Sequence, residues 1–253
     1  MIRIKNEKQI EGIRKSCKLL ARLFKEIVPM TVAGVSTKEL DDFAKDFMHK
    51  HGGSPAWYKE NFPGAICCSI NDEVIHGIPS KKRIIRDGDL VSLDIGIDLG
   101  GYISDSTVTV PVGNVDSACL KMLEAAKESL AAGIDACRVG NRISHISNAV
   151  YDVLAPKGYG VVYSFCGHGV GLKVHEDPSI PNVPDGGSNH RIVPGMVLAI
   201  EPMVNLGTPD VEILEDGWTV VTADGKPSVH VEHTVAVFKD HTEILTVLDP
   251  DEE

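Results

Sequence analysis

Two aspartates stand eleven residues apart in β-type sequence, close enough to share one hairpin. Asp94 lies in the run VSLDIGID and Asp105 in YISDSTVTV, with a turn-like segment at residues 99–101 between them. In an antiparallel hairpin with an even-numbered loop, both side chains project from one face. A loop at 99–100 pairs them directly, and a loop at 100–101 makes them diagonal neighbours. Two such carboxylates repel each other unless a proton or a cation lies between them. The alternative is an ordinary exposed strand face.

Three more side chains of the metal-binding type follow in the second half of the chain. His168 lies in CGHGVG, where the glycines predict a loop, and Glu201 ends the apolar run MVLAIE at a strand end before Pro202. Glu232 lies inside the predicted strand HVEHTVAVF. Taken singly, these residues would be a turn histidine and two surface carboxylates of edge strands. Together with the two aspartates they form an oxygen-rich ligand set, which suits Co, Mn, Fe or Zn, with carboxylates bridging two ions.

The elements that must position these side chains occur in the same order twice. Helical spacing of apolar residues predicts helices over residues 6–28 and 117–136, each followed by a second helix, at about 36–52 and 143–155. The sequence Ser36-Thr37-Lys38-Glu39 is a capping-box pattern. Strand-like runs follow each helix pair: ICCSI, LVSLDIGI and ISDSTVTV, then GYGVVYSF, MVLAIEP, GWTVVTA and HVEHTVAVF. We therefore expect an α+β fold of two related halves with antiparallel sheets, helices on one face and a site on the other.

Composition restricts the class of protein further. The 253 residues are 43% hydrophobic, which is enough for a proper core, and the formal net charge of −11 disfavours bulk binding to nucleic acid or anionic membrane. No apolar run approaches the roughly 18 residues of a membrane span, and the opening MIRIKNEKQIEGIRK lacks the apolar segment of a secretory signal. None of the six cysteines forms a C-x-x-C pair, so we expect reduced thiols and a cytoplasmic protein.

At these residues the chain resembles the type I methionine aminopeptidases over nearly its whole length. The motifs are HGIP (76–79), LDIGID, CGHGVG, HEDP, GMVLAIEPM and VEHT, in that order. The resemblance implies the pita-bread fold, two pseudo-symmetric halves around a central dinuclear metal site. It implies one catalytic domain over 1–253 with a repeat at about 1–112 and 113–253. Only 26 residues separate His175 from Glu201, which indicates the short, bacterial-style form.

The same resemblance implies the activity and assigns roles by position. The implied reaction removes the N-terminal methionine of nascent proteins when the second residue is small, with two divalent ions activating a water molecule. Asp94 and His168 would each bind one metal, Asp105 and Glu232 would bridge, and Glu201 would bind the second metal and relay a proton to the leaving amine. The two catalytic histidines that are not ligands match His76, at the scissile amide, and His175, at the oxyanion. The methionine pocket matches Cys67, Phe62 and Trp218.

Three departures from the family pattern concern the surroundings of this site. An aromatic residue is replaced by Val174, the usual Tyr-rich stretch by KENFPGAICCS, and a common Gln by His230. His230 is either half in solvent at a strand end or donates an N–H to a ligand carboxylate. On a continuous strand, His230 and Thr234 would flank Glu232 while His233 points away. With an ordinary pKa of about 6.5, protonated His230 would weaken the site, so His230→Gln should extend activity to lower pH.

Two other functions remain open at this point. The first is an X-Pro peptidase of the creatinase–prolidase type, although such enzymes usually carry a further N-terminal domain, which we expect to be absent. The second is a pita-bread binding protein without catalysis, which would be expected to lack metal ligands. The expected partner is the N-terminal methionine of nascent polypeptides, met at the ribosome by a monomeric enzyme that binds neither membrane nor specific nucleic acid.

Overall fold

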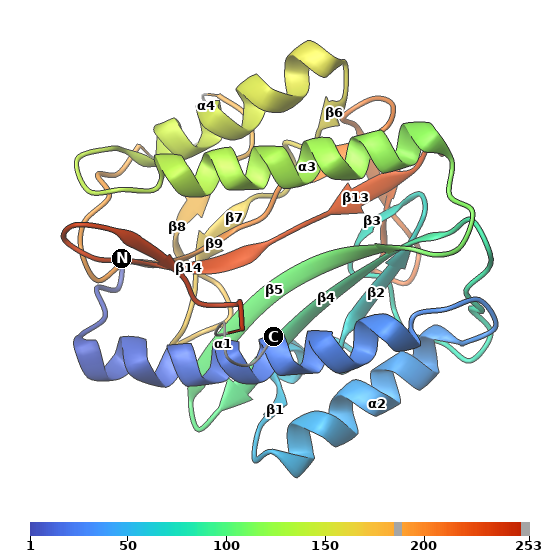
Figure 1. The fold of residues 1–253 in the computed structure, drawn as a ribbon, viewed down its shortest axis with the longest axis horizontal. Helices are drawn as coiled ribbons and strands as arrows, with labels where there is room; N and C mark the ends of the chain where they lie inside the picture. Colours follow the sequence, from blue (N-terminus) through green and yellow to red (C-terminus); the bar gives the residue numbers. More distant parts are fainter. Residues whose placement is uncertain (185–188, 249–253) are drawn as a thin grey trace.

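The helices of the computed structural model, which describes residues 1–184 and 189–248, form two pairs outside a β core (Figure 1). The first pair is α1 (Glu7–Ile27) and α2 (Thr37–Lys50), and the second is α3 (Ser117–Ala136) and α4 (Ile143–Leu154). Three 3-10 turns follow helices or strands: η1 (Val28–Met30), η2 (Ala56–Glu60) and η3 (Ala155–Lys157). The four predicted helices are therefore confirmed. Within the described ranges, no helix is both long and apolar enough to cross a membrane.

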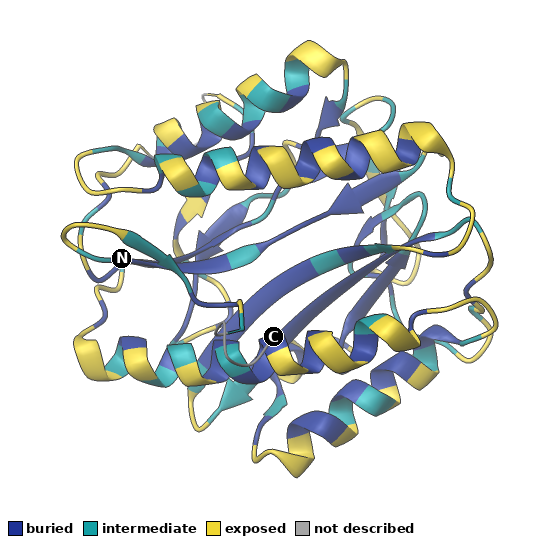
Figure 2. Ribbon diagram, in the orientation of Figure 1, coloured by how far each residue is buried: buried dark blue, intermediate teal, exposed yellow. Residues whose placement is uncertain are grey.

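Capping explains where the first two helices begin. At α1 the side chain of Asn6 accepts from the backbone N–H of Gln9 while the Gln9 side chain accepts from the Asn6 N–H. Ser36 and Glu39 form the same reciprocal pair at α2, as the capping-box pattern predicts. Each helix has a buried side and an exposed side (Figure 2); the buried residues are mostly apolar, with the charged Asp41 of α2 among them.

The sheet of the first half is built around a long hairpin. Its strands are β1 (Ser54–Pro55), β2 (Cys67–Ile70), β4 (Leu90–Leu99) and β5 (Tyr102–Pro111), with β4 pairing antiparallel to the other three. The hairpin loop is Gly100–Gly101, and both glycines have positive φ, 63° and 88°, as a two-residue hairpin turn requires. Asp94 consequently pairs with Thr107, and Asp105 with Gly96. The two aspartates are therefore diagonal neighbours on one face, the second of the two predicted registers.

Three antiparallel sheets contain the remaining strands. A five-stranded sheet has the order β15 (Thr242–Ile244), β14 (His233–Val237), β9 (Val197–Ile200), β7 (Gly167–Gly169) and β8 (Glu176–Ile180). A three-stranded sheet joins β13 (Ser228–His230), β10 (Met203–Asn205) and β6 (Gly160–Val161). Another joins β11 (Val211–Ile213), β12 (Val220–Thr222) and β3 (Glu73–Ile75), so that a first-half strand pairs with a second-half strand. The α+β class is confirmed.

Two predicted local structures of the second half are wrong. CGHGVG is not a loop: His168 lies in β7, and the flanking glycines are required because a Cβ at Gly167 would stand 2.4 Å from the Ala199 carbonyl oxygen and one at Gly169 2.3 Å from that of Asp177. HVEHTVAVF is not one strand, since it divides into β13 and β14 with Glu232 between them. At CGHGVG, close packing between neighbouring strands outweighs the preference of glycine for turns.

The two halves meet where β5 runs beside β14 (Figure 1), and side-chain hydroxyls take part in most hydrogen bonds across this seam between the described residues. Ser106 donates to the Glu232 carbonyl, Thr109 to that of His230 and Thr234 to that of Asp105, each at 2.7 Å. One isolated bridge joins Thr107 to Glu232. The seam therefore brings the carboxylates of both halves to the centre of the molecule.

Candidate active site

One cavity of about 130 Å³ is lined by every site residue predicted from the sequence. Its lining combines acidic, imidazole and aromatic side chains from both halves of the chain. The predicted residues among them are Phe62, Cys67, His76, Asp94, Asp105, His168, His175, Glu201, Trp218, His230 and Glu232. Trp57, Glu60 and Ile75 complete the lining.

Strands place the acidic side chains on one wall. Asp94 comes from β4, whose backbone is fixed there by the Trp57 Nε1–H donating to the Asp94 carbonyl at 3.2 Å. Asp105 comes from β5, and Glu201 follows the last residue of β9, the strand end that was predicted. Potential ligand atoms of Asp105, His168 and Glu232 lie within 4.8 Å of one another. The arrangement is compatible with a shared cation.

Several oxygen atoms of this wall are buried without a hydrogen-bond partner among the described residues. They are Asp94 Oδ1, Asp105 Oδ1 and Glu232 Oε1. The three residues are 8%, 2% and 2% exposed, so water cannot solvate their charges freely. Buried carboxylate oxygens are normally satisfied, because leaving a buried charge unpaired is costly. Their orphaned state fits a site that divalent cations complete.

The titration behaviour of the acids points the same way. Burial raises the pKa of Asp94 to about 6. Burial, followed by repulsion from the neighbouring carboxylates, raises the pKa of Asp105, Glu201 and Glu232 well above the usual range. Without a cation, the cluster would therefore hold protons that ordinary carboxylic acids release.

His168 presents a neutral nitrogen to the same point. Burial lowers its pKa to about 3, so the ring is uncharged at neutral pH. Its Nδ1 lies 3.0 Å from the Gly169 carbonyl, which makes Nδ1 the N–H donor and leaves a lone pair on Nε2. Nε2 lies 3.6 Å from Asp105 Oδ2 and 3.4 Å from Glu201 Oε1. This is the geometry of a potential ligand among carboxylates.

The other two predicted histidines stand around the acids. The His175 side chain is 55% exposed, its ring meets that of His168 edge-on with centroids 4.5 Å apart, and its Nδ1 lies 3.8 Å from Glu60 Oε2. Burial lowers the pKa of His76 to about 4, and its ring lies edge-on to Trp218 at 6.2 Å. Two further imidazoles therefore line the cavity beside the acids.

An apolar recess adjoins the acids. Phe62 and Trp218 pack edge to face with centroids 5.3 Å apart, and Cys67, directly opposite Asp94 in the sheet, belongs to the same hydrophobic cluster. Val174 is fully buried in that cluster and leaves the aromatic contacts to Phe62 and Trp218. A recess with aromatic walls beside polar groups is typical of a small side-chain pocket.

His230 is buried, and the expectation of a half-solvated ring is wrong. The residue is 2% exposed, and its Nε2 lies 3.3 Å from Glu201 Oε2. Burial lowers its pKa to about 4, so the expectation of an ordinary pKa is wrong as well. The ring adjoins a candidate ligand carboxylate, and whether it orients that carboxylate stays a prediction.

Two residues that contact predicted site residues were missed from the sequence. Thr107 donates its hydroxyl to Glu232 Oε2 at 2.8 Å, and its position two residues after Asp105 on one strand face was an available signal. Glu60 lies in the segment KENFPG, which was identified only as a departure from a family pattern. Its contact with His175 joins residues far apart in sequence, and no local pattern indicates it.

Comparison with known proteins places this geometry in a family. The model of metallopeptidase family M24 matches residues 11–239. The chain is 61% identical over 247 residues to the methionine aminopeptidase of Treponema pallidum (strain Nichols), covering 97% of this chain and 96% of that protein.

Solved structures agree. The methionine aminopeptidase of Thermotoga maritima superposes with a TM-score of 0.94 at 35% identity, over 98% of this chain and 100% of that one, which confirms the predicted fold. The prolidase of Pyrococcus furiosus has a TM-score of 0.77 at 23% identity, over 97% of this chain and 66% of that one, and shares the fold alone.

Proposed function

Because the chain belongs to metallopeptidase family M24, and within it to the methionine aminopeptidases, we propose that its cavity holds two divalent cations beside a methionine pocket. The enzyme removes the N-terminal methionine of polypeptides. One observation carries the proposal for the site: buried, partnerless carboxylate oxygens from both halves face the same cavity as the aromatic recess.

Five side chains would hold the cations. They combine four carboxylates and one neutral imidazole, a donor set that suits Co, Mn, Fe or Zn: Asp94, Asp105, His168, Glu201 and Glu232. Two divalent cations would match the four negative charges that otherwise repel one another. When bound, the cations supply Lewis-acid activation of water and of the scissile carbonyl group.

The remaining polar side chains would act on the peptide. His175, half-exposed at the side of the cavity next to His168, would stabilise the oxyanion that develops on the carbonyl. His76, neutral because burial lowers its pKa, would contact the scissile amide. Glu201 would relay a proton to the leaving amine, a role compatible with the raised pKa of its buried carboxyl group.

The apolar recess would select the first side chain. Phe62, Cys67 and Trp218 can enclose an unbranched thioether chain without offering it a polar partner. We propose that the second residue of the substrate must be small, because the side chains of His76, His175 and Glu60 line the same cavity as the recess.

Metal analysis combined with a peptide panel tests this function. The protein, purified without oxygen and loaded separately with each candidate ion, should bind two ions per chain. It should cleave Met-Ala-Ser at least about 10²-fold faster than Leu-Ala-Ser or Met-Leu-Ser, the scale of discrimination that a hydrophobic pocket supplies. Cleavage restricted to bonds before proline would favour the prolidase alternative, and absence of bound metal and activity would favour the non-catalytic one.

We also propose the cellular setting. The acidic balance of the chain and its cysteine usage support a cytoplasmic enzyme acting on nascent polypeptides at the ribosome as a monomer, with one catalytic domain over 1–253. The molar mass of the purified protein, measured by analytical ultracentrifugation, tests whether it is a monomer.

A further inference from the structure

The backbone of His76 is held in an unusual conformation. Its φ of 59° lies in the left-handed region, which residues other than glycine seldom adopt and which persists only where surrounding structure enforces it. The next residue, Gly77, is packed so closely that a Cβ there would stand 2.4 Å from the Cys68 carbonyl oxygen. The segment 76–80 has no helix or strand of its own to fix it. Something else must therefore hold it.

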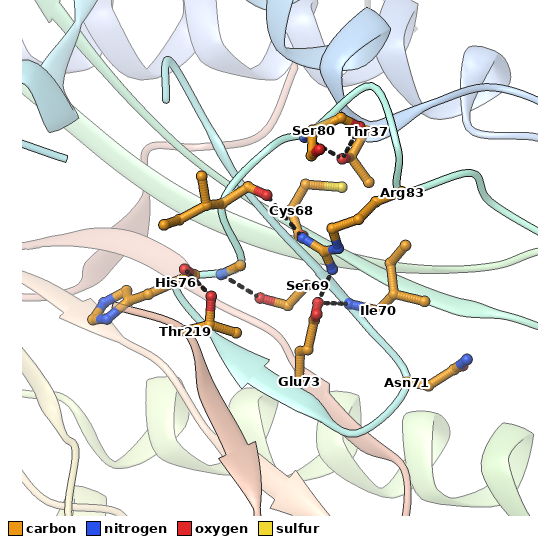
Figure 3. Close-up of polar contacts among 12 residues, drawn as sticks. Thr37, Cys68, Ser69, Ile70, Asn71, Glu73, His76, Ser80, Arg83 and Thr219 are labelled. Atoms are coloured by element: carbon orange, nitrogen blue, oxygen red, sulfur yellow. Dashed lines mark hydrogen bonds and ion pairs between the residues drawn. The ribbon is translucent and has the colours of Figure 1, made fainter. Parts of the chain in front are cut away.

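The guanidinium of Arg83 lies at the centre of the contacts that do so (Figure 3). Its Nη1 donates to the carbonyl oxygens of Ile78, at 2.9 Å, and of Cys68, at 3.2 Å. Its Nη2 pairs with Glu73 Oε2. One planar group thus ties the segment 76–80 to strand β2 and to the first residue of β3, a fork geometry that a lysine ammonium cannot reproduce.

Glu73 supplies the counter-charge and a further tie. The carboxylate oxygen that meets Arg83 also accepts the Ile70 backbone N–H at 2.7 Å. The side chains of Glu73 and Arg83 are only 17% and 24% exposed, so the pair is shielded from water and screened less than a surface pair. Burial raises the pKa of Glu73 and the Arg83 charge opposes that rise.

The flanks of the segment are fixed independently. Ser69 Oγ accepts the Gly77 N–H at 3.1 Å, and Thr37 Oγ1 accepts the Ser80 N–H at 2.8 Å (Figure 3). The Thr219 hydroxyl donates to the His76 carbonyl over a long 3.5 Å. Arg83 is the charged group among these contacts, and it holds the middle of the segment at Ile78.

We propose that Arg83, with Glu73 as its counter-charge, is a positioning residue for His76: it fixes the strained segment so that the imidazole faces the scissile amide. The inference rests on the proposed role of His76. Arg83 touches neither the cavity nor the candidate ligands, so it acts on the reaction through the backbone alone.

The test compares Arg83→Met with Arg83→Lys, His76→Ala and the double variant His76→Ala/Arg83→Met, all as full-length, Mn-loaded enzyme on Met-Ala-Ser. Arg83→Met should lower kcat by about 10²-fold, the loss that a misplacement of about 1 Å produces, while KM changes little. Arg83→Lys should recover part of the loss. The affinity for Mn²⁺, measured by calorimetry, should stay within about twofold of wild type, because no ligand is disturbed.

The double variant tests whether Arg83 acts on the reaction through His76. If Arg83 acts through His76, the double variant should be no slower than His76→Ala alone. If the losses in kcat of the two single variants multiply in the double variant, the inference is overturned and the proposed function stands. The same holds if Arg83→Met has the wild-type kcat while His76→Ala is slow. A wild-type rate for His76→Ala would overturn both the inference and the proposed role of His76.

Two further variants protect the interpretation. If Arg83→Met does not fold because Glu73 is left without its partner, Arg83→Met/Glu73→Gln removes both charges and should show the same selective loss of kcat. Arg86→Gln, at an exposed arginine three residues away, is the matched control and should behave as wild type. A wild-type kcat for folded Arg83→Met/Glu73→Gln would also overturn the inference.

Discussion

Replacing Asp94 by Asn should stabilise the metal-free enzyme, although it removes a candidate metal ligand. In the folded chain without cations, burial raises the pKa of Asp94 from 3.8 to about 6. The charged carboxylate is therefore less stable in the folded state than in the unfolded state. Asparagine has a similar shape and carries no charge. The variant should therefore avoid the loss of folding free energy that the wild type suffers at every pH at which Asp94 is ionised.

The size of the effect follows from the shift. Two pKa units correspond to about 3 kcal/mol. An unfolding entropy of about 2.1 cal/mol/K per residue converts this to roughly 6 °C in Tm for this chain. Because the folded state binds the proton more tightly than the unfolded state, the wild type gains stability as pH falls through 6, and the gain is complete below 3.8. The advantage of the variant should therefore be full at pH 8, about half at pH 5 and absent below pH 3.8.

Thermal unfolding of chelator-treated proteins, followed by circular dichroism between pH 5 and 8, measures this difference. Adding Mn²⁺ at pH 8 should reverse the order, because the wild type binds the ions more tightly and gains more stability from them. Asp46→Asn, at an exposed position on α2, is the control and should leave Tm nearly unchanged at every pH. A metal-free wild type that melts above Asp94→Asn at pH 8 would refute the reasoning, since the carboxylate would then be stabilised by something other than a cation.

Three further predictions concern neighbouring side chains. Asp105→Ala should abolish both the activity and the binding of the two metal ions in calorimetry, because its carboxylate would bind both ions. A variant that still binds two ions tightly and turns over at a near-normal rate would contradict the bridging role. His175→Ala should lower kcat by about 10²–10³-fold with metal affinity unchanged, the loss expected for an oxyanion donor, whereas joint loss of metal and activity would make His175 a ligand. His230→Gln should leave the acid limb of the pH profile of kcat/KM in place, because burial lowers the pKa of His230 to about 4 and the ring is already neutral above pH 5; a shifted limb would show that the ring does titrate in the working enzyme.

Local patterns in the sequence determine much of this molecule. The helices follow from the spacing of apolar residues and from caps such as Asn6 and Ser36. The common face of Asp94 and Asp105 follows from strand parity alone. Parity could not select the hairpin loop, because residues 99–100 and 100–101 both offer a glycine turn; the positive φ that both glycines adopt decides for the second.

Other features depend on contacts that no local pattern contains. His168 was expected in a loop because glycine favours turns, yet its glycines serve the close approach of β8 and β9. His230 is buried, and its backbone hydrogen-bonds to the hydroxyl of Thr109 in β5, a residue 121 positions earlier in the chain. The pairing of Arg83 with Glu73 spans ten residues with no periodic signal, so only the folded structure reveals it.

The hydroxyl seam has a consequence for the order in which the molecule assembles. Its bonds join residues 121 to 129 positions apart, so forming them closes long chain loops, which makes the seam a slow step of folding. Until the seam closes, β5 is an exposed edge strand of its sheet, the kind of surface on which chains aggregate, whereas β14 is flanked on both sides by β9 and β15. Closing the seam covers the β5 edge but forces the acidic side chains together. Cations present during synthesis would therefore favour this last step, and a cell short of them should accumulate half-closed, aggregation-prone chains before it accumulates folded, inactive enzyme.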